Sequence, residues 1–275
     1  MILDTVSTIF SYPFLIRAVI VGVLVSLCAS LLGVSLVLKR YSMIGDGLSH
    51  VGFGALAVAA ALNAAPLSVA VPVCIICAVC LLGIKDSSKL AGDAAIAIVS
   101  SGALAIGIMV ISMSSGMNTD VYNYMFGSIL AMSAEDVKLS LVLSVFVLIL
   151  FIVFYHKIFA ITFDETFARA TGVKAGVYNT LIAVLTAVTI VLGMRMMGAL
   201  LISSLIIFPA LTSMRVCRTF KSVIINAAVI SVVCLIAGVT LSYVAATPAG
   251  ASVVLANLVM MVLYTVVGAV KNHMR

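Results

Sequence analysis

Residues 17–38 read RAVIVGVLVSLCASLLGVSLVL, an apolar run whose single charge, Arg17, stands at its start. As an α-helix, a run of this length crosses the hydrocarbon core of a bilayer, which takes about 20 apolar residues. Because lipid offers no partner for free backbone N–H and C=O groups, a single spanning segment of this kind has to be helical. The run therefore predicts a membrane protein built from α-helices.

The rest of the chain has the same character. Of its 275 residues, 64% are hydrophobic and only 9% are charged, whereas about 25% of the residues in an ordinary soluble domain are charged. With a mean hydropathy of +1.36, the composition excludes a water-soluble globule. The net charge of +6 is then expected to reflect membrane orientation, and nucleic acid is not an expected partner.

We expect an all-α, polytopic fold with eight or nine transmembrane helices in one domain that covers residues 1–275. A surface or re-entrant hairpin is expected at 117–136, because its apolar part is too short to cross the bilayer. The nine candidate spans are 17–38, 47–63, 64–84, 94–114, 137–155, 175–193, 199–214, 223–245 and 251–270.

Basic residues predict the orientation of these spans, because Lys and Arg collect in cytoplasmic loops. With nine spans, the other face receives only Arg17, Lys138 and Arg195. The N-terminus is therefore expected outside and the C-terminus in the cytoplasm. Twelve of the fifteen basic residues fall on the predicted cytoplasmic face, namely Lys39, Arg40, Lys85, Lys89, Lys157, Arg169, Lys174, Arg215, Arg218, Lys221, Lys271 and Arg275.

The stretch 39–54, KRYSMIGDGLSHVGFG, places two ionisable residues where a membrane helix begins. Asp46 and His50 are four residues apart, so in a helix they share one face, one turn apart. An Asp within a membrane span costs on the order of 2.5–3.5 kcal/mol on insertion scales. A carboxylate oxygen and an imidazole nitrogen suit zinc, manganese or ferrous iron. The alternative is structural: Asp46 caps the helix, and His50 bonds a carbonyl.

A second informative stretch is 162–173, TFDETFARATGV, in a predicted cytoplasmic loop. Thr162 as N-cap, an acidic first turn and a terminating Gly172 predict a short amphipathic helix. It is either a solvated loop helix or a docking element for a cytoplasmic subunit, with aromatic anchors and a polar rim. The residues of that element are Phe163, Asp164, Glu165, Phe167 and Arg169.

Three motifs, in order along the chain, resemble a known family: GDGLSHVGFGALA at 45–57, TFDETFARATGV at 162–173 and GMRMMGALLISSLIIFPALTS at 193–213. Together they look like the membrane permease of bacterial ABC importers for zinc, manganese and other divalent metals. The resemblance implies metal ligation by Asp46 and His50 in the translocation path, and a coupling helix at about 162–173.

The resemblance also implies partners and a location. These are a second copy of the permease, two ATP-binding subunits and an extracytoplasmic metal-binding protein, all at the bacterial cytoplasmic membrane. No permanently bound cofactor is expected, since the metal ion is the transported substrate. The chain itself lacks the G-x-x-x-x-G-K-[ST] phosphate-binding motif, so ATP hydrolysis is expected in a separate chain and the permease is not expected to be an enzyme.

Two other function classes could use the same residues. In a stand-alone secondary transporter, Asp46 and His50 would relay protons and no ATPase would be needed. An intramembrane enzyme is disfavoured, because the sequence contains neither H-E-x-x-H nor G-x-S-x-G, and a lone Asp–His pair is a poor catalytic set.

Overall fold

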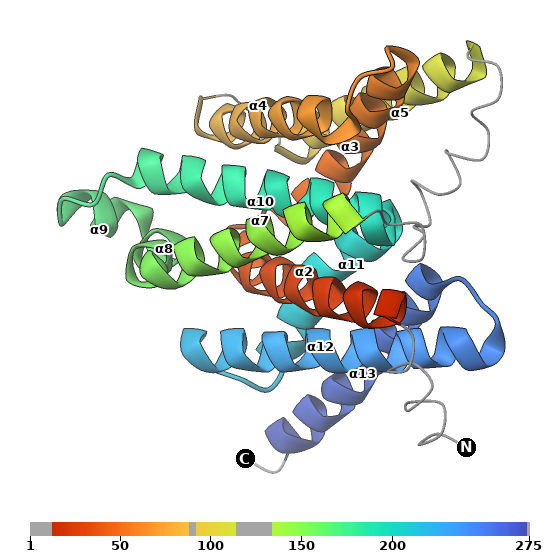
Figure 1. Cartoon of the computed structure of the whole chain (residues 1–275). Helices are drawn as coiled ribbons and strands as arrows, with labels where there is room; N and C mark the ends of the chain where they lie inside the picture. The colour runs from red at the N-terminus through yellow and green to blue at the C-terminus, as the bar shows by residue number, and fades with distance from the viewer. Residues whose placement is uncertain (1–12, 88–91, 114–133, 274–275) are drawn as a thin grey trace.

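The structure, a computed structural model, describes residues 13–87, 92–113 and 134–273, and every regular element in these ranges is an α-helix (Figure 1). The helices are α2 (Pro13–Leu38), α3 (Ile44–Ala61), α4 (Pro66–Ser87), α5 (Gly92–Met113), α7 (Ala134–Val153), α8 (Tyr155–Phe163), α9 (Glu165–Ala170), α10 (Ala175–Met197), α11 (Ala199–Met214), α12 (Phe220–Ala245) and α13 (Ala249–His273).

The predicted polytopic all-α fold is confirmed, and all nine predicted spans correspond to helices. Within the described ranges, seven helices are long and apolar enough to cross a bilayer singly: α2, α3, α4, α5, α10, α12 and α13. The predicted span 137–155 differs, because α7 and α8 meet at a 68° bend and form an eighth span only as a pair. The span 199–214 is also unusual, since α11 has only 16 residues.

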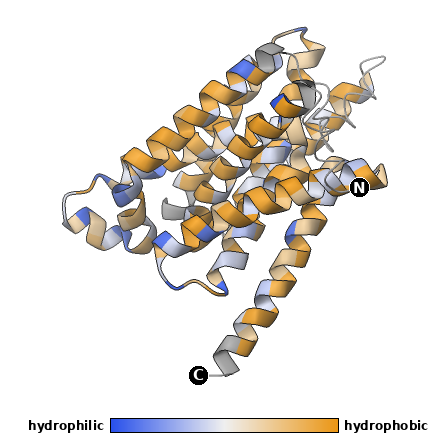
Figure 2. Cartoon of the chain, turned by 60° about the horizontal axis from the view of Figure 1, so that its bottom comes forward, coloured by the Kyte–Doolittle hydropathy of each residue, from blue (hydrophilic) through white to orange (hydrophobic). Residues whose placement is uncertain are grey.

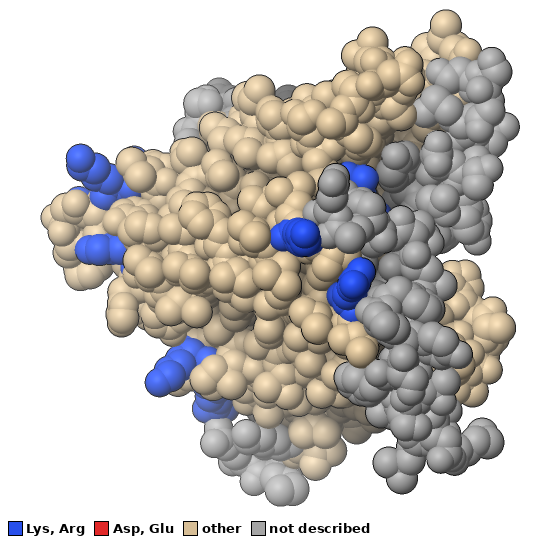
Figure 3. Space-filling view, viewed as in Figure 1, with Lys and Arg blue, Asp and Glu red and all other residues tan. Residues whose placement is uncertain are grey.

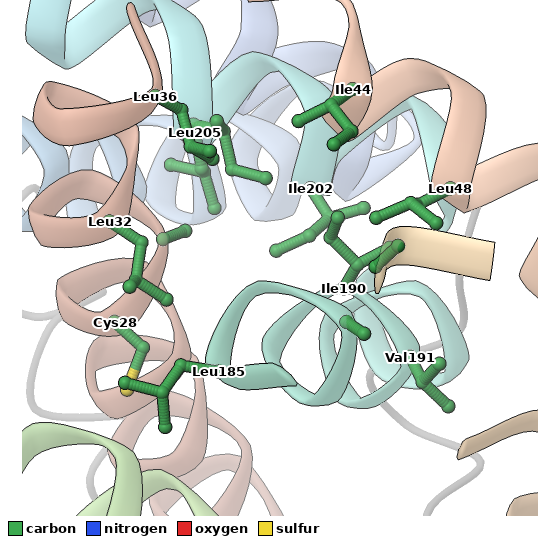
Figure 4. Packing of buried hydrophobic residues seen from close by; sticks show 14 of the residues in the cluster. Cys28, Leu32, Leu36, Ile44, Leu48, Leu185, Ile190, Val191, Ile202 and Leu205 are labelled. Carbon is green, nitrogen blue, oxygen red and sulfur yellow. The ribbon is translucent and has the colours of Figure 1, made fainter. Parts of the chain in front are cut away.

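The centre of the bundle is formed by α2, α3, α10 and α11 (Figure 1). Side chains from these four helices meet in a continuous apolar core, as Figure 4 shows for Leu32 of α2, Leu48 of α3, Leu185 of α10 and Leu205 of α11. Each of these four side chains is fully or almost fully buried. The core therefore surrounds the helix that carries Asp46 and His50.

The outer helices α4, α5, α7, α12 and α13 bury one side and expose large apolar residues on the other. Exposed positions include Ile98 on α5, Val142 on α7 and Val259 on α13. Figure 2 shows that hydrophobic residues run along the long helices, whereas hydrophilic ones concentrate in the connections. Such a surface is stable in lipid and unstable in water.

Glycine allows two pairs of helices to approach closely. A Cβ added at Gly33 of α2 would lie 2.0 Å from the carbonyl oxygen of Ile206 in α11, and one added at Gly54 of α3 would lie 2.6 Å from that of Ala103 in α5. Real Cβ atoms do not come so near to a backbone oxygen. Small residues at helix contacts are typical of membrane bundles, where close backbone packing replaces the hydrophobic effect. The contact at Gly54 holds α3 close against α5.

One end of the bundle carries α8, α9 and the start of α10, and we call it the α9 end (Figure 1). Lys and Arg side chains project from this end at the left of Figure 3. The predicted hairpin at 117–136 lies outside the described residues up to position 133. Its last part, 134–136, belongs to the first turn of α7 rather than to a hairpin.

Candidate metal site and docking helix

Asp46 and His50 lie one turn apart at the start of α3. Oδ2 of Asp46 is 3.7 Å from Nε2 of His50, and the side chains are 47% and 24% exposed. Metal–ligand bonds of about 2.0–2.2 Å to oxygen and nitrogen let one cation touch two atoms this far apart. Asp46 stands in the first turn of α3, where the positive end of the helix dipole stabilises a carboxylate. The two side chains are accessible and close enough together for one cation to contact both.

The structural alternative for this pair is not what the structure shows. The N-cap of α3 is Met43, which makes no side-chain capping bond, so Asp46 does not cap the helix. Within the described part of the chain, His50 has no hydrogen bond to a backbone carbonyl, and its side chain pairs with that of Asp46. Neither side chain is therefore occupied by a hydrogen bond to the backbone of α3.

Ser49, next to His50, connects α3 to α11. Its hydroxyl donates a hydrogen bond to the carbonyl oxygen of Asp46 (2.7 Å) and lies 3.5 Å from the hydroxyl of Ser203. Ser203 in turn donates to the carbonyl of Ala199, one turn earlier in α11. The two hydroxyls thus lie close together where α3 packs on α11, beside Asp46 and His50. Ser203 was not singled out in the sequence.

Within the described ranges, Asp46 and His50 have no third His, Cys, Asp or Glu side chain placed beside them. Among the residues that the structure describes, no group of three or more His, Cys, Asp or Glu side chains is placed to hold a metal ion. Zinc sites are usually four-coordinate, so two side chains complete a site only with further ligands from water or another chain.

The predicted helix at 162–173 is present but begins later than expected. Asp164, rather than Thr162, is the N-cap of α9, and its carboxylate accepts a hydrogen bond from the backbone N–H of Phe167 (2.8 Å). Thr162 is buried within α8, where its hydroxyl donates to the carbonyl of Ile158. Gly172, with φ +85°, follows α9 and allows the chain to turn. The sequence pattern was right about the element but wrong about its cap.

Aromatic side chains form an exposed surface beside α9. Phe163 and Phe167 are 59% and 65% exposed. The ring of Phe163 packs against those of Phe159 (centroids 5.0 Å apart) and Phe220 (5.7 Å). We call the exposed residues Phe159, Phe163 and Phe167 the aromatic surface, and the buried Phe220 lies beneath it. Phe159 and Phe220 were not singled out in the sequence, because they become neighbours of α9 only when α8 packs on α12.

Glu165 and Arg169, which were expected in the polar rim of the docking element, are paired with each other, and Glu165 is also paired with other residues of the chain. The Arg169 guanidinium donates to Oε1 of Glu165 (2.6 Å), while Oε2 accepts from the side-chain amide of Asn179 (3.1 Å) and lies 3.5 Å from Nζ of Lys39. Burial acts to raise the pKa of Glu165, but the hydrogen bonds from Asn179 and Arg169 and the charges of Lys39 and Arg169 outweigh it, so the pKa is lowered. Glu165 is therefore held within the chain as a carboxylate.

Known proteins are similar in sequence to this chain along most of its length. The sequence profile of the ABC 3 transport family matches residues 11–268. The chain belongs to this family. Members of the ABC 3 transport family are transport proteins rather than enzymes, and the resemblance found in the three sequence motifs is thereby confirmed.

Relatives in the ABC 3 transport family match this chain over nearly its whole length. It is 29% identical to the high-affinity zinc uptake system membrane protein ZnuB of Haemophilus influenzae, covering 92% of this chain and 97% of that protein. It is 28% identical to the manganese transport system membrane protein MntC of Halalkalibacterium halodurans, covering 90% and 85%. The solved structure of PsaBC from Streptococcus pneumoniae in complex with Fab is similar, with a TM-score of 0.86, 28% identity and coverage of 96% and 95%.

Proposed function

We propose that this chain is the membrane permease subunit of an ATP-driven importer for a divalent transition-metal ion. The observation that carries the proposal is the Asp46–His50 pair, two borderline ligands that are accessible at the start of a central helix and are not used to cap it. Family membership supports ATP-driven transport. The names of the zinc and manganese relatives support zinc or manganese as the transported ion, and the ligand preferences of both ions, and of ferrous iron, agree with the pair.

We propose that two copies of the chain complete the metal site. One chain offers two side-chain ligands at this place among its described residues, and a second Asp46–His50 pair would bring the number to the four that zinc favours. In this arrangement the single domain of residues 1–275 is half of the permease, and no cofactor stays bound. Equilibrium binding of zinc to the purified chain should then give one ion for two chains.

We further propose that α9 and the aromatic surface dock a separate ATP-binding subunit, one for each permease copy. Exposed aromatic anchors such as Phe163 and Phe167 supply most of the energy of a typical interface, and the basic residues at the α9 end favour a cytoplasmic position. In this orientation the N-terminus is outside, the C-terminus is cytoplasmic, and an extracytoplasmic metal-binding protein delivers the ion to the opposite end. Asp164 shapes the docking helix, and Glu165 with Arg169 stabilises it.

The test of the proposal is metal uptake by vesicles that contain the chain and its ATPase subunit. Asp46→Ala and His50→Ala should each abolish ATP-driven uptake of zinc or manganese while membrane insertion stays normal. His156→Ala, which removes an exposed imidazole on α8, is the matched control and should transport normally. Wild-type uptake by both site variants would refute the assigned ligands.

The same vesicles distinguish the alternative of a stand-alone transporter. Membership in the ABC 3 transport family disfavours it. Vesicles that contain the chain alone should take up no metal when only a proton gradient is applied. Uptake under that condition would replace the ABC mechanism by proton-coupled transport.

A further inference from the structure

Three polar side chains that are far apart in the sequence meet at the α9 end. Lys39, the residue after α2, contacts Oε2 of Glu165 in α9 and donates a hydrogen bond to Oδ1 of Asn179 in α10. The side-chain amide of Asn179 closes the triangle by donating to the same Oε2. The Lys39 side chain is only 9% exposed. Buried charges of this kind are stable only when paired, so each member of the triangle depends on the other two.

Lys39 also stands in an unusual turn. After it, Arg40 adopts a left-handed conformation with φ +62°, which normally favours glycine because a Cβ is crowded there. The turn is closed by hydrogen bonds from the N–H of Tyr41 to the carbonyl of Leu36 (2.8 Å) and from the N–H of Arg40 to that of Val37 (3.0 Å). Non-glycine residues in this conformation persist only when their surroundings hold them. The pairing of Lys39 supplies such a restraint.

No flexible linker separates this turn from the metal pair. The N–H of Ile44, the first residue of α3, donates to the carbonyl of Tyr41 (3.0 Å), and the N–H of Gly47 donates to that of Met43 (3.0 Å). Asp46 lies in the turn of helix that these bonds build. A displacement of Lys39 is therefore passed to Asp46 through a short piece of backbone that these hydrogen bonds hold together.

A small cavity gives this backbone room to move. It has a volume of about 180 Å³ and lies between α4 and α10, where Tyr41 and Asn179 contribute to its wall together with Val79 and Thr180. Well-packed interiors contain few voids larger than a water molecule. The cavity therefore lets the Tyr41 turn shift without first forcing α4 and α10 apart.

We propose that the contact of Lys39 with Glu165 and Asn179, which we call the latch, couples the docking helix α9 to the metal-binding helix α3. The inference rests on the proposed function. When the ATPase moves α9, Glu165 moves with it and pulls Lys39 and the turn at 39–43, which reorients Asp46 and His50. Lys39 and Asn179 are positioning residues: they act on the metal through α3 and touch neither the metal nor the ATPase.

The test measures metal uptake per ATP hydrolysed, in vesicles that contain the full complex. Lys39→Met should leave co-purification of the ATPase unchanged and ATP hydrolysis within about twofold of wild type, while uptake per ATP falls at least tenfold. Lys39→Arg, which keeps the charge and the reach, should retain most of the uptake. Lys221→Met, which removes an exposed lysine at the same end, is the matched control and should behave as wild type.

A second comparison separates coupling from general damage. If Lys39 and Glu165 act as one unit, the variant with both Lys39→Met and Glu165→Gln should lose no more uptake per ATP than the worse single variant. Wild-type uptake per ATP in Lys39→Met, or loss of the ATPase from that variant, would overturn the latch. Absence of ATP-driven uptake in the wild-type complex would instead overturn the proposed function itself.

Discussion

Gly54 determines how closely α3 can approach α5. Gly54→Ala would place a methyl group 2.6 Å from the backbone oxygen of Ala103, and a backbone atom cannot rotate away as a side chain can. Overpacking of this kind typically costs about 1–3 kcal/mol, more than the gain of up to about 1 kcal/mol from alanine's helix propensity. We expect a lower free energy of unfolding, measured by denaturant titration of the chain in detergent micelles.

Gly102, in α5, provides the control for Gly54→Ala. A Cβ at this position meets no atom within 4 Å, so Gly102→Ala should be neutral or stabilise α5 by up to about 1 kcal/mol through helix propensity. Equal stability of the two variants would show that the α3–α5 contact is not limited by Gly54.

Single residues differ in how visible they are in the sequence. Asp46 and His50 can be predicted because lipid penalises them wherever they point, so their presence in an apolar run needs an explanation. Lys39 and Asn179 cannot, because they are 140 positions apart and each alone is an ordinary polar residue at a helix end. Their pairing exists only once α2 and α10 are packed. Ser203 was missed for the same reason.

α9 is a helix of six residues, which is too short to be stable by itself, so its cap matters. Asp164→Ala removes the carboxylate that accepts from the N–H of Phe167, a loss that typically costs about 0.5–2 kcal/mol. We expect faster amide hydrogen exchange in α9 and a reduced yield of co-purified ATPase.

Asp164→Asn keeps an oxygen that can accept the same hydrogen bond, and asparagine is as good an N-cap as aspartate. This variant should therefore retain both the protection of α9 and the ATPase. If Asp164→Asn were as weak as Asp164→Ala, the charge rather than the cap would be the important property.

The ionisation of Glu165 makes the attachment of α9 depend on pH. Its pKa is lowered in the folded chain from the ordinary value of 4.5, so the carboxylate stabilises the fold fully above about that pH and progressively less as the pH falls through the lowered value. Hydrogen exchange in α9, corrected for its intrinsic rate, should increase below pH 4.5. In Glu165→Gln the increase should disappear, and an unchanged pH profile in that variant would contradict this assignment.

Helices could be predicted from the sequence where the length and hydropathy of an apolar run determine their position. The apolar run 199–214 coincides with α11, and the other runs differ from their helices mainly at the ends. The 68° bend between α7 and α8 left no such signal, because Phe154 at the junction is apolar like its neighbours and no Pro or Gly stands there. The cap of α9 was misplaced by two residues because Thr162 and Asp164 are both good N-cap residues.

The whole molecule has an apolar outer surface that only a membrane or a partner subunit can cover. Val259, near the middle of α13, is exposed on this surface. Val259→Lys should cost on the order of 2.5–3.5 kcal/mol of insertion free energy and lower the amount of chain in the membrane fraction. Leu62→Lys, at an exposed position in the connection after α3, should be tolerated, because a residue there reaches water. Equal yields would place Val259 outside the hydrocarbon core.

The arrangement of the helices was not predictable from their sequences. α2, α10 and α12 are apolar on every side, so no amphipathic face indicates which of them is central. Their order in the bundle is set by shape, for example where Gly33 lets α2 touch the backbone of α11. Such complementarity belongs to pairs of helices and becomes visible only in three dimensions.

The short helix α11 lies beside the proposed path of the ion, and the two parts of this path, on either side of Asp46 and His50, differ in length. Its 16 residues rise about 24 Å, less than the roughly 30 Å of a hydrocarbon core. Ser203, which contacts Ser49 beside the candidate ligands, lies one turn from the break at Gly198 and three turns from the far end of the helix. In the proposed orientation, α3 starts just after Lys39 at the cytoplasmic α9 end, so an arriving cation passes most of the length of α3 before it reaches Asp46 and His50. The shorter passage then lies on the cytoplasmic side of the pair, where leakage must be prevented between transport cycles.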